Sequence, residues 1–356
     1  MSSMRPHPAL LPLAWVYGGM MAVRNRCYDA GIFTSSKVVA PVISVGNLTA
    51  GGTGKTPLVD EIVGRLEAAG RKVGIISRGY GRESKGPVVV ARGDGNVVGA
   101  NQAGDEAAML AGRHRNAVVI VAERRKVAAE IAVGELGADV LVMDDGYQHR
   151  SLRRDLDILV VDGRRDLLHE AMLPAGYRRE PLGGIRRAGL LAVSKLDTVE
   201  EVSTVARALR EWSSAPVFGF RAAFESALDL RTGKTFDLQA GEQAYVMSGI
   251  GDPEGFRATV REAGCRVVGG TAFGDHHRYT AADLESVVGR AHAMGAGLIA
   301  TTEKDAMRLT GDWAREFVAQ SIVPHVVFRM KIEIFEGEQE LQRAIMRVLK
   351  GTGPLC

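Results

Sequence analysis

The stretch PVISVGNLTAGGTGKTPLVDEIVGRLEAAG, Pro41 to Gly70, reads as an apolar strand, a glycine-rich loop ending in Lys-Thr, and a helix. In that helix Leu58, Ile62 and Leu66 share one face. Glycines allow backbone N–H groups to turn inward around phosphate oxygens, and the following helix directs its positive end toward the anion. The stretch therefore predicts a phosphate-binding loop between a buried strand and a helix.

The loop departs from the pattern G-x-x-x-x-G-K-[ST] at its first position, where Thr49 replaces glycine. Lys55 is predicted to neutralise the terminal phosphates of ATP, and Thr56 to offer its hydroxyl to Mg²⁺. A glycine-rich turn that binds nothing is the alternative, but the strand before it and the helix after it favour phosphate binding. The predicted nucleotide contacts are Thr49, Ala50, Gly51, Gly52, Thr53, Gly54, Lys55 and Thr56.

A second strand, in ADVLVMDDGYQHR (138–150), ends in two adjacent carboxylates, Asp144 and Asp145. Carboxylates at the end of a buried strand can hold the magnesium shell that accompanies nucleotide phosphates, directly or through water. An aspartate at a strand end is also common as a helix cap. Downstream of a phosphate loop, however, the pair favours a magnesium site.

Apolar, β-branched runs recur at intervals that suit alternating strands and helices. Continuous apolar runs are typical of strands buried on both faces, as in parallel sheets. They predict a doubly wound, mostly parallel α/β domain, in which ligands bind at the carboxyl ends of the strands. The runs are 41–45, 72–77, 117–122, 139–144, 156–162 and 189–195.

The pattern changes after Ala215. Two extended runs around Thr232-Gly233 predict a hairpin or linker, and a second, smaller α/β pattern follows. Its expected strands lie in 244–251, 265–273 and 297–302, with helices over 280–295 and 338–350.

The N-terminal run PALLPLAWVYGGMMAV (8–23) carries no charge and is followed by Arg24 and Arg26. As a helix it would be about 24 Å long, shorter than the ~30 Å hydrocarbon core of a bilayer. We favour a helix lying in a membrane interface, with Trp15 and Tyr17 near the headgroups and the arginines on anionic lipid. A buried core helix and a signal peptide remain open alternatives.

Composition indicates an ordinary folded protein of about two domains. The chain has 356 residues, 46% hydrophobic and 24% charged, with a formal net charge of +3. This charge does not imply nucleic acid, and the aromatic content of 6% is too sparse for single-strand stacking. Cys27, Cys265 and Cys356 lie far apart, which favours a reducing compartment without disulfides.

Two other nucleotide-binding classes fit less well. Partitioning-type ATPases carry an extra lysine where this chain has Ala50, although a membrane-associated ATPase of that switch type stays the alternative function. GTPases read guanine with N-K-x-D, which SKLD (194–197) approaches, but serine cannot make the contacts of asparagine. A non-catalytic nucleotide-binding module would leave the carboxylates unexplained.

Eight motifs occur in an order that resembles the tetraacyldisaccharide 4'-kinase family, over nearly the whole chain. They are GNLTAGGTGKTP, SRGYGR (77–82), AGDEA (103–107), MDDGYQHR (143–150), REPL, GIGDPEGF (249–256), FGDHHRY (273–279) and TEKDAMRL (302–309). The resemblance implies a P-loop domain joined to a smaller α/β domain by a β-ribbon. The expected divisions are a membrane-associating helix at 1–25, the kinase domain at 26–215, the ribbon at 216–238 and the small domain at 239–356.

The resemblance also implies an activity: ATP-dependent phosphorylation of the 4'-hydroxyl of an acylated glucosamine disaccharide 1-phosphate, a lipid, at the cytoplasmic face of the bacterial inner membrane. It implies no nucleic acid and no obligate protein partner. Asp105 matches the family's proposed base, and His276 matches its partner. From the residues alone, Asp105 would be a helix-capping acid and His276 a polar loop residue. Because the two lie on either side of the ribbon, we expect domain closure to assemble them.

The remaining expected site residues fall into three sets. Lys55 and Asp145 join Asp105 and His276 as catalytic residues. The expected metal set is Thr56, Asp144, Asp145 and, more weakly or in the outer shell, Glu180. The expected contacts to the sugar phosphate are Asn47, Arg78, Arg124, Gln148, His149 and Arg150.

Overall fold

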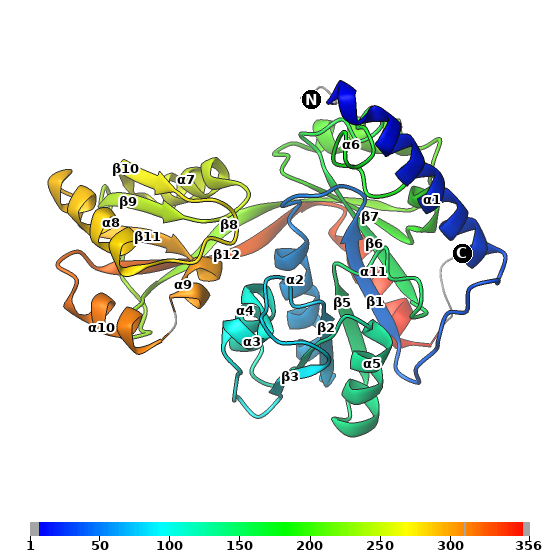
Figure 1. Cartoon of the computed structure of the whole chain (residues 1–356), viewed down its shortest axis with the longest axis horizontal. Coiled ribbons are helices and arrows are strands. Elements are labelled where there is room, and N and C mark those ends of the chain that lie inside the picture. Colours follow the sequence, from blue (N-terminus) through cyan, green and yellow to red (C-terminus); the bar gives the residue numbers. More distant parts are fainter. Residues whose placement is uncertain (1–6, 310, 352–356) are drawn as a thin grey trace.

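A computed structural model describes residues 7–309 and 311–351. Its strands form one sheet, which passes through two units joined by a pair of long strands (Figure 1). We call the unit built on the phosphate loop the large domain and the other the small domain. The strand order is β10-β9-β11-β12-β8-β7-β6-β1-β5-β2-β4-β3.

The large domain places the phosphate-loop strand β1 between β5 and β6, and pairs it in parallel with both. Its central strands are buried on both faces, as their continuous apolar runs predict. The predicted doubly wound, mostly parallel α/β class is confirmed. The strands are β1 (Val42–Asn47), β2 (Val73–Ser77), β3 (Val88–Arg92), β4 (Val118–Val121), β5 (Val140–Asp144), β6 (Leu156–Asp162) and β7 (Leu190–Ser194).

Strand β3 was not predicted from the sequence. It pairs antiparallel with β4 at the edge of the sheet, and its first residues are only half-buried. A strand with one covered face gives a weaker apolar signal than the central strands do. The helices of the large domain are α1 (Leu11–Asp29), α2 (Lys55–Ala68), α3 (Ala100–Ala103), α4 (Asp105–Arg113), α5 (Arg125–Glu130) and α6 (Val199–Leu209), with short helical turns at Pro8–Leu10, Ile131–Glu135 and Leu182–Arg187.

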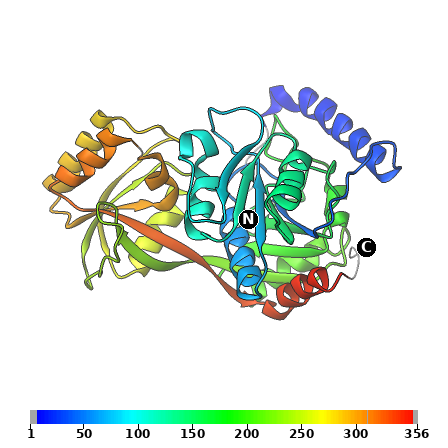
Figure 2. The ribbon, with the colours of Figure 1, turned by 90° about the horizontal axis from the view of Figure 1, so that it is seen from below.

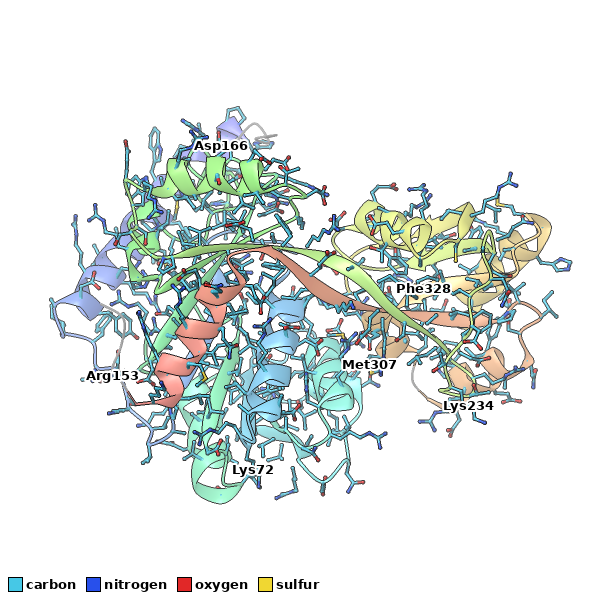
Figure 3. All side chains as sticks on the ribbon, turned by 180° about the vertical axis from the view of Figure 1, so that it is seen from behind. Lys72, Arg153, Asp166, Lys234, Met307 and Phe328 are labelled. Atoms are coloured by element: carbon cyan, nitrogen blue, oxygen red, sulfur yellow. The ribbon has the colours of Figure 1, made fainter. Side chains whose placement is uncertain are left out.

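Two long antiparallel strands, β8 (Val217–Asp229) and β12 (His325–Glu336), connect the domains. Figure 3 shows them running from one unit into the other, with Phe328 in the part of β12 that belongs to the small domain. The expected ribbon at 216–238 is therefore corrected. The turn at Thr232-Gly233 exists, but the run after it makes only an isolated bridge, Leu228 to Thr235, and β8 pairs instead with β12.

The small domain carries the predicted strands and helix as β9 (Gln243–Ser248), β10 (Arg266–Ala272), β11 (Leu298–Thr302) and α8 (Ala281–Ala293). Strand β9 pairs in parallel with both β10 and β11. The other helices of the small domain are α7 (Pro253–Glu262), α9 (Glu303–Arg308) and α10 (Asp312–Gln320). Met307 of α9 packs against the core of the large domain, so the two domains also meet beside the ribbon.

The C-terminal helix α11 (Glu338–Leu349) belongs to the large domain, which corrects the expected small domain of 239–356. The ribbon strand β12 returns the chain to the large domain, where the apolar face of α11 packs in the same cluster as Ile43 of β1. Figure 2 shows α11 and α1 on opposite sides of this domain. The buried side chains of α11 are Leu341, Ala344, Ile345 and Val348. Residues 352–356, including Cys356, lie outside the described residues, as do residues 1–6 of the expected N-terminal segment.

The N-terminal helix α1 has one docked face and one uncovered apolar face. Tyr17 and Asn25 bond to the large domain, whereas Trp15 is 74% exposed. A buried core helix, one of the open alternatives, does not fit this exposure. Among the described residues, no helix has both the length and the apolarity needed to span a membrane. The exposed apolar side chains of α1 are Leu13, Trp15, Val16, Met20 and Val23.

A buried histidine in the ribbon is expected to make stability depend on pH. His325 is 2% exposed, and among the described residues neither ring nitrogen has a hydrogen-bond partner. Burial lowers the pKa of His325 to about 4. The folded protein therefore keeps this ring neutral while the unfolded chain protonates near pH 6.5, so stability is full above that pH and falls as pH drops toward 4.

We expect His325→Leu to remove part of this acid sensitivity. The loss of unfolding free energy between pH 8 and pH 5, measured by urea unfolding, should be about 1–2 kcal/mol smaller than in the wild type. His169→Gln, at an exposed ring, should leave the loss unchanged. An equal loss in His325→Leu and the wild type would contradict the prediction.

Candidate active site

The phosphate loop connects β1 to α2 and is braced from beneath and from both sides. Gly51 and Gly54 adopt φ values of 107° and 86°, which favour glycine. Asn47 Nδ2 donates to Thr53 Oγ1 at 2.9 Å, and Ser194 Oγ donates to the Thr53 carbonyl at 2.8 Å. The loop is thus held open by its neighbours, with Lys55 and Thr56 starting the helix.

The carboxylate pair lies beside this loop because β5 runs parallel to β1, with Val45 opposite Asp144. Asp144 is buried, and its Oδ1 has no hydrogen-bond partner among the described residues. Burial, with Glu106 and Asp145 nearby, raises the pKa of Asp144. An orphaned buried carboxylate oxygen at the end of the strand beside β1 is the kind of ligand atom that a magnesium ion satisfies.

Asp145 has a different environment. Its backbone is left-handed, with φ 48°, and its carboxylate lies 3.6 Å from Lys55 Nζ. Arg179 Nη1 donates to both of its oxygens, at 2.9 and 2.8 Å. Burial opposes ionisation, but the charges of Lys55 and Arg179 lower the pKa of Asp145. Asp145 therefore holds two cations, Lys55 and Arg179, beside the phosphate loop.

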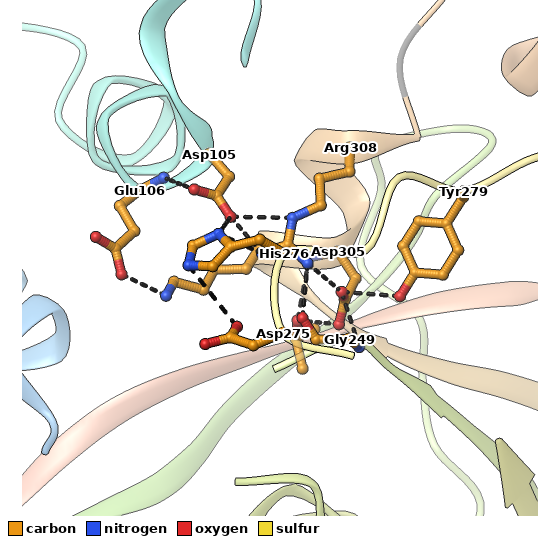
Figure 4. Close-up of polar contacts among 10 residues, drawn as sticks. Asp105, Glu106, Gly249, Asp275, His276, Tyr279, Asp305 and Arg308 are labelled. Carbon is orange, nitrogen blue, oxygen red and sulfur yellow. Dashed lines mark hydrogen bonds and ion pairs between the residues drawn. The ribbon is translucent and has the colours of Figure 1, made fainter. Parts of the chain in front are cut away.

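Asp105 and His276 meet across the two domains (Figure 4). Asp105 is the first residue of α4, and His276 lies in the loop after β10 with a φ of 60°. His276 Nδ1 is 3.1 Å from Asp105 Oδ2, although the residues are 171 positions apart. The hydrogen bond to Asp105 raises the pKa of His276, with burial opposing it. The Tyr80 ring contacts the imidazole at 4.8 Å between centroids.

Sequence reasoning missed the cations around this pair. Arg308 pairs with Asp105, and Lys304 pairs with Glu106, both from α9 of the small domain. Their spacing of i and i+4 in TEKDAMRL, which puts both on one helix face, is the signal that could have found them. Burial opposes ionisation, but His276, Lys304 and Arg308 hold the pKa of Asp105 well below its ordinary value.

Glu180 links the N-terminal helix α1 to Gln148, in the loop that follows Asp144 and Asp145. Its Oε2 accepts from Asn25 Nδ2 at 2.8 Å and its Oε1 from Gln148 Nε2 at 2.9 Å. Arg187 donates to both oxygens at 3.0 Å. With both oxygens engaged and the side chain fully buried, Glu180 holds Gln148 and α1 in place and has no carboxylate face left for direct metal binding.

Two expected sugar-phosphate contacts have other partners. Asn47 is 0% exposed and its Nδ2 supports Thr53 from below, while its Oδ1 has no hydrogen-bond partner among the described residues. Arg150 donates to the Asn25 carbonyl at 3.0 Å and to Asp29 at 2.6 Å. Asn47 therefore supports the loop and Arg150 holds α1, and contact of either with the acceptor stays a prediction.

The other expected contacts are Arg78, Arg124, Gln148 and His149. Arg78 and Arg124 are exposed, at the end of β2 and before α5. Gln148 Nε2 donates to the Asn47 carbonyl at 2.8 Å. Burial, followed by the charge of Arg125, lowers the pKa of His149 to about 4, so this ring is neutral at physiological pH. Arg125, the next residue along the chain from Arg124, is buried with its Nε unpartnered among the described residues.

Within residues 7–309 and 311–351, no three His, Cys, Asp or Glu side chains are grouped to hold a metal ion by themselves. A magnesium ion here would need oxygens from the nucleotide as well as Thr56 and Asp144, which is how P-loop proteins hold it.

Comparisons with known proteins agree on one family. The model of the family described as "Tetraacyldisaccharide-1-P 4'-kinase" matches residues 6–350. A tetraacyldisaccharide 4'-kinase of Chlorobaculum tepidum is 39% identical over 352 residues, covering 96% of this chain and 97% of the relative. One from Anaeromyxobacter sp. (strain Fw109-5) is 39% identical over 330 residues, covering 91% and 86%.

A solved structure is similar over the same length. The crystal structure of the "apo" form of LpxK from Aquifex aeolicus in complex with ATP matches with a TM-score of 0.75 and 31% identity. The match covers 96% of this chain and 98% of that one.

Proposed function

The chain belongs to the tetraacyldisaccharide-1-P 4'-kinase family, and we propose that Asp105 and His276 form the pair that removes the proton from its acceptor hydroxyl. The protein is an ATP-dependent kinase that phosphorylates the 4'-hydroxyl of a tetraacylated glucosamine disaccharide 1-phosphate in lipid A biosynthesis. What remains to be assigned is how its own residues carry out this transfer.

The contact between Asp105 and His276 carries the proposal. The sugar oxygen bonds to the γ-phosphorus of ATP, the bond from that phosphorus to the bridging oxygen breaks, and ADP leaves. Asp105 takes the hydroxyl proton, and His276, 3.1 Å away, orients the carboxylate and compensates its charge. A pair formed by both domains limits futile ATP hydrolysis, because an open molecule lacks a complete base.

The phosphate loop and its neighbours supply the remaining charge stabilisation. Lys55 and Arg179, held by Asp145, face the terminal phosphates, and loop N–H groups surround them. Thr56 and Asp144 would hold Mg²⁺, whose charge neutralises the phosphate oxygens. Glu180 supports this shell through Gln148. The exposed Arg78 and Arg124 suit the 1-phosphate of the acceptor.

The acceptor's acyl chains stay in a bilayer, and the uncovered face of α1 suits contact with the same surface, the cytoplasmic face of the inner membrane. Its apolar side chains point away from the domain to which Tyr17, Arg24 and Asn25 are bonded. Deleting α1 would therefore disturb the active site as well as the membrane contact, and substitution on the outer face is the cleaner test.

We expect the triple substitution Trp15→Ser, Val16→Ser and Met20→Ser to lower binding to anionic lipid vesicles by about tenfold or more, because it removes apolar area that the membrane would cover. Co-sedimentation measures this, while transfer to detergent-solubilised acceptor should stay within about twofold. Trp313→Ser with Met294→Ser, exposed apolar residues of the small domain, is the matched control. Unchanged vesicle binding in the α1 variant would contradict this role.

The whole assignment is tested by incubating the protein with γ-labelled ATP, Mg²⁺ and the tetraacylated disaccharide 1-phosphate. We expect label in a bisphosphorylated glycolipid whose new phosphate is on the 4'-oxygen. Labelled inorganic phosphate without labelled lipid would contradict the assignment and favour an ATPase.

A further inference from the structure

We propose that Arg308 is a positioning residue for the base: from the small domain it holds Oδ2 of Asp105 and thereby presents the other oxygen, Oδ1, to the acceptor hydroxyl. This inference rests on the proposed function, in which Asp105 takes the hydroxyl proton.

Arg308 bonds to only one of the two carboxylate oxygens of Asp105. Arg308 Nε donates to Asp105 Oδ2 at 3.0 Å, and Arg308 Nη2 donates to the same atom. His276 Nδ1 also lies on Oδ2. Asp105 Oδ1 accepts from the backbone N–H of Glu106 at 3.0 Å and keeps a second lone pair. Oδ2 is therefore held by Arg308 and His276, whereas Oδ1 can receive a proton (Figure 4).

The guanidinium is itself fixed by the small domain. Arg308 Nη1 donates to the Gly249 carbonyl at 2.7 Å and to Asp305 Oδ1 at 3.1 Å. Asp305 is buried and accepts from Gly249 N–H, the Tyr279 hydroxyl and the Thr302 hydroxyl at 3.0, 2.9 and 2.7 Å. Since these contacts lie within one domain, the direction of Arg308 is set before Asp105 meets it.

Two further ion pairs align the helices that carry the contact. Glu303 and Lys304 of α9 pair with Arg113 and Glu106 of α4, so α9 follows α4 along its length. Opening the domains would separate all three pairs at once. The orientation of Asp105 then depends on the small domain being in place. Of the two side chains that hold Asp105 Oδ2, Arg308 stays charged, whereas His276, 3.3 Å from Arg308 Nη2, can gain or lose a proton.

The test compares Arg308→Ala, Arg308→Lys and the wild type in the lipid transfer assay. We expect kcat of Arg308→Ala to fall about 30- to 100-fold, with KM for ATP within about threefold, because the ATP contacts are elsewhere. Arg308→Lys should recover part of the loss. Guanidinium ion added to Arg308→Ala should restore activity at least about fivefold over the same concentration of sodium chloride.

The pH dependence gives an independent readout. Removing Arg308 removes one of the charges that lower the pKa of Asp105, so activity of Arg308→Ala should begin to fall at a higher pH than that of the wild type as the solution is acidified. Arg278→Ala is the matched control, since Arg278 is an exposed arginine that also crosses between domains, to Glu83 at 2.8 Å. It should keep near wild-type kcat and show no response to guanidinium.

Thermal unfolding and ATP titration of each variant show whether a loss of activity comes from a loss of the fold. A kcat of Arg308→Ala within about threefold of wild type overturns the inference. So does a loss that neither lysine nor guanidinium restores in a folded variant. If Arg308→Ala does not fold, Arg308→Lys decides by the same pH profile. If Asp105→Asn retains full transfer, the proposed base is wrong; if Asp105→Asn is inactive and Arg308→Ala is not, only the role of Arg308 is wrong.

Discussion

Replacing Lys55 by Met will lower kcat for lipid phosphorylation by about 10³-fold or more. Lys55 is the first residue of α2, and its ammonium lies 3.6 Å from Asp145 Oδ1. Methionine keeps the length of the side chain and removes the charge that the transferring phosphoryl group needs. Asp145 would then face the phosphates with Arg179 as its remaining close ion-pair partner.

Single-turnover transfer from γ-labelled ATP measures the loss without interference from product release. Lys72→Met, at the far end of the large domain in Figure 3, should behave as the wild type. Thermal unfolding of the two variants should match within a few degrees. A Lys55→Met protein that transfers phosphate at more than about a tenth of the wild-type rate would contradict the role of the loop.

Asp105→Asn is expected to lower kcat about 10²- to 10⁴-fold while leaving ATP affinity unchanged, because asparagine keeps the shape of the carboxylate but cannot accept the proton. His276→Ala should cost less, about 10- to 100-fold, since the histidine acts through Asp105. The two losses should not multiply in the double variant, because the residues form one unit at 3.1 Å.

Asp139→Asn, on an exposed carboxylate outside the site, is the control for this series. ATP binding by calorimetry separates a lost base from a lost nucleotide site. Full transfer by Asp105→Asn, or additive losses in the double variant, would contradict the assignment of the pair.

Some of the active site was readable from the sequence because its residues are neighbours along the chain. Thr49 to Thr56 form one continuous loop, and Asp144 with Asp145 ends one strand. Parallel pairing of two buried strands then requires their carboxyl ends to lie together. Local pattern and one rule of sheet geometry were therefore enough to place the loop beside the carboxylates. The family resemblance added Asp105 and His276, which no local pattern distinguishes from a cap and a loop residue.

What the chain's own pattern could not show depends on contacts between distant segments. The two-stranded ribbon was expected from one stretch, but β8 pairs with β12, and that pairing returns α11 to the large domain. Asn47 and Arg150 have side chains suited to a sugar phosphate, and only the structure shows that the first also supports Thr53 and the second also bonds to α1.

The sequence by itself determined the strand–loop–helix unit, the carboxylate pair and the doubly wound sheet, because each follows from periodicity and from residue types that are close along the chain. Only the tertiary structure decided which charges face one another: Arg308 and His276 on Asp105, Arg179 on Asp145, and Glu180 between α1 and Gln148. The reason is physical. An isolated motif carries the chemistry of its side chains, but the partner that holds a buried charge is chosen by the packing of whole domains.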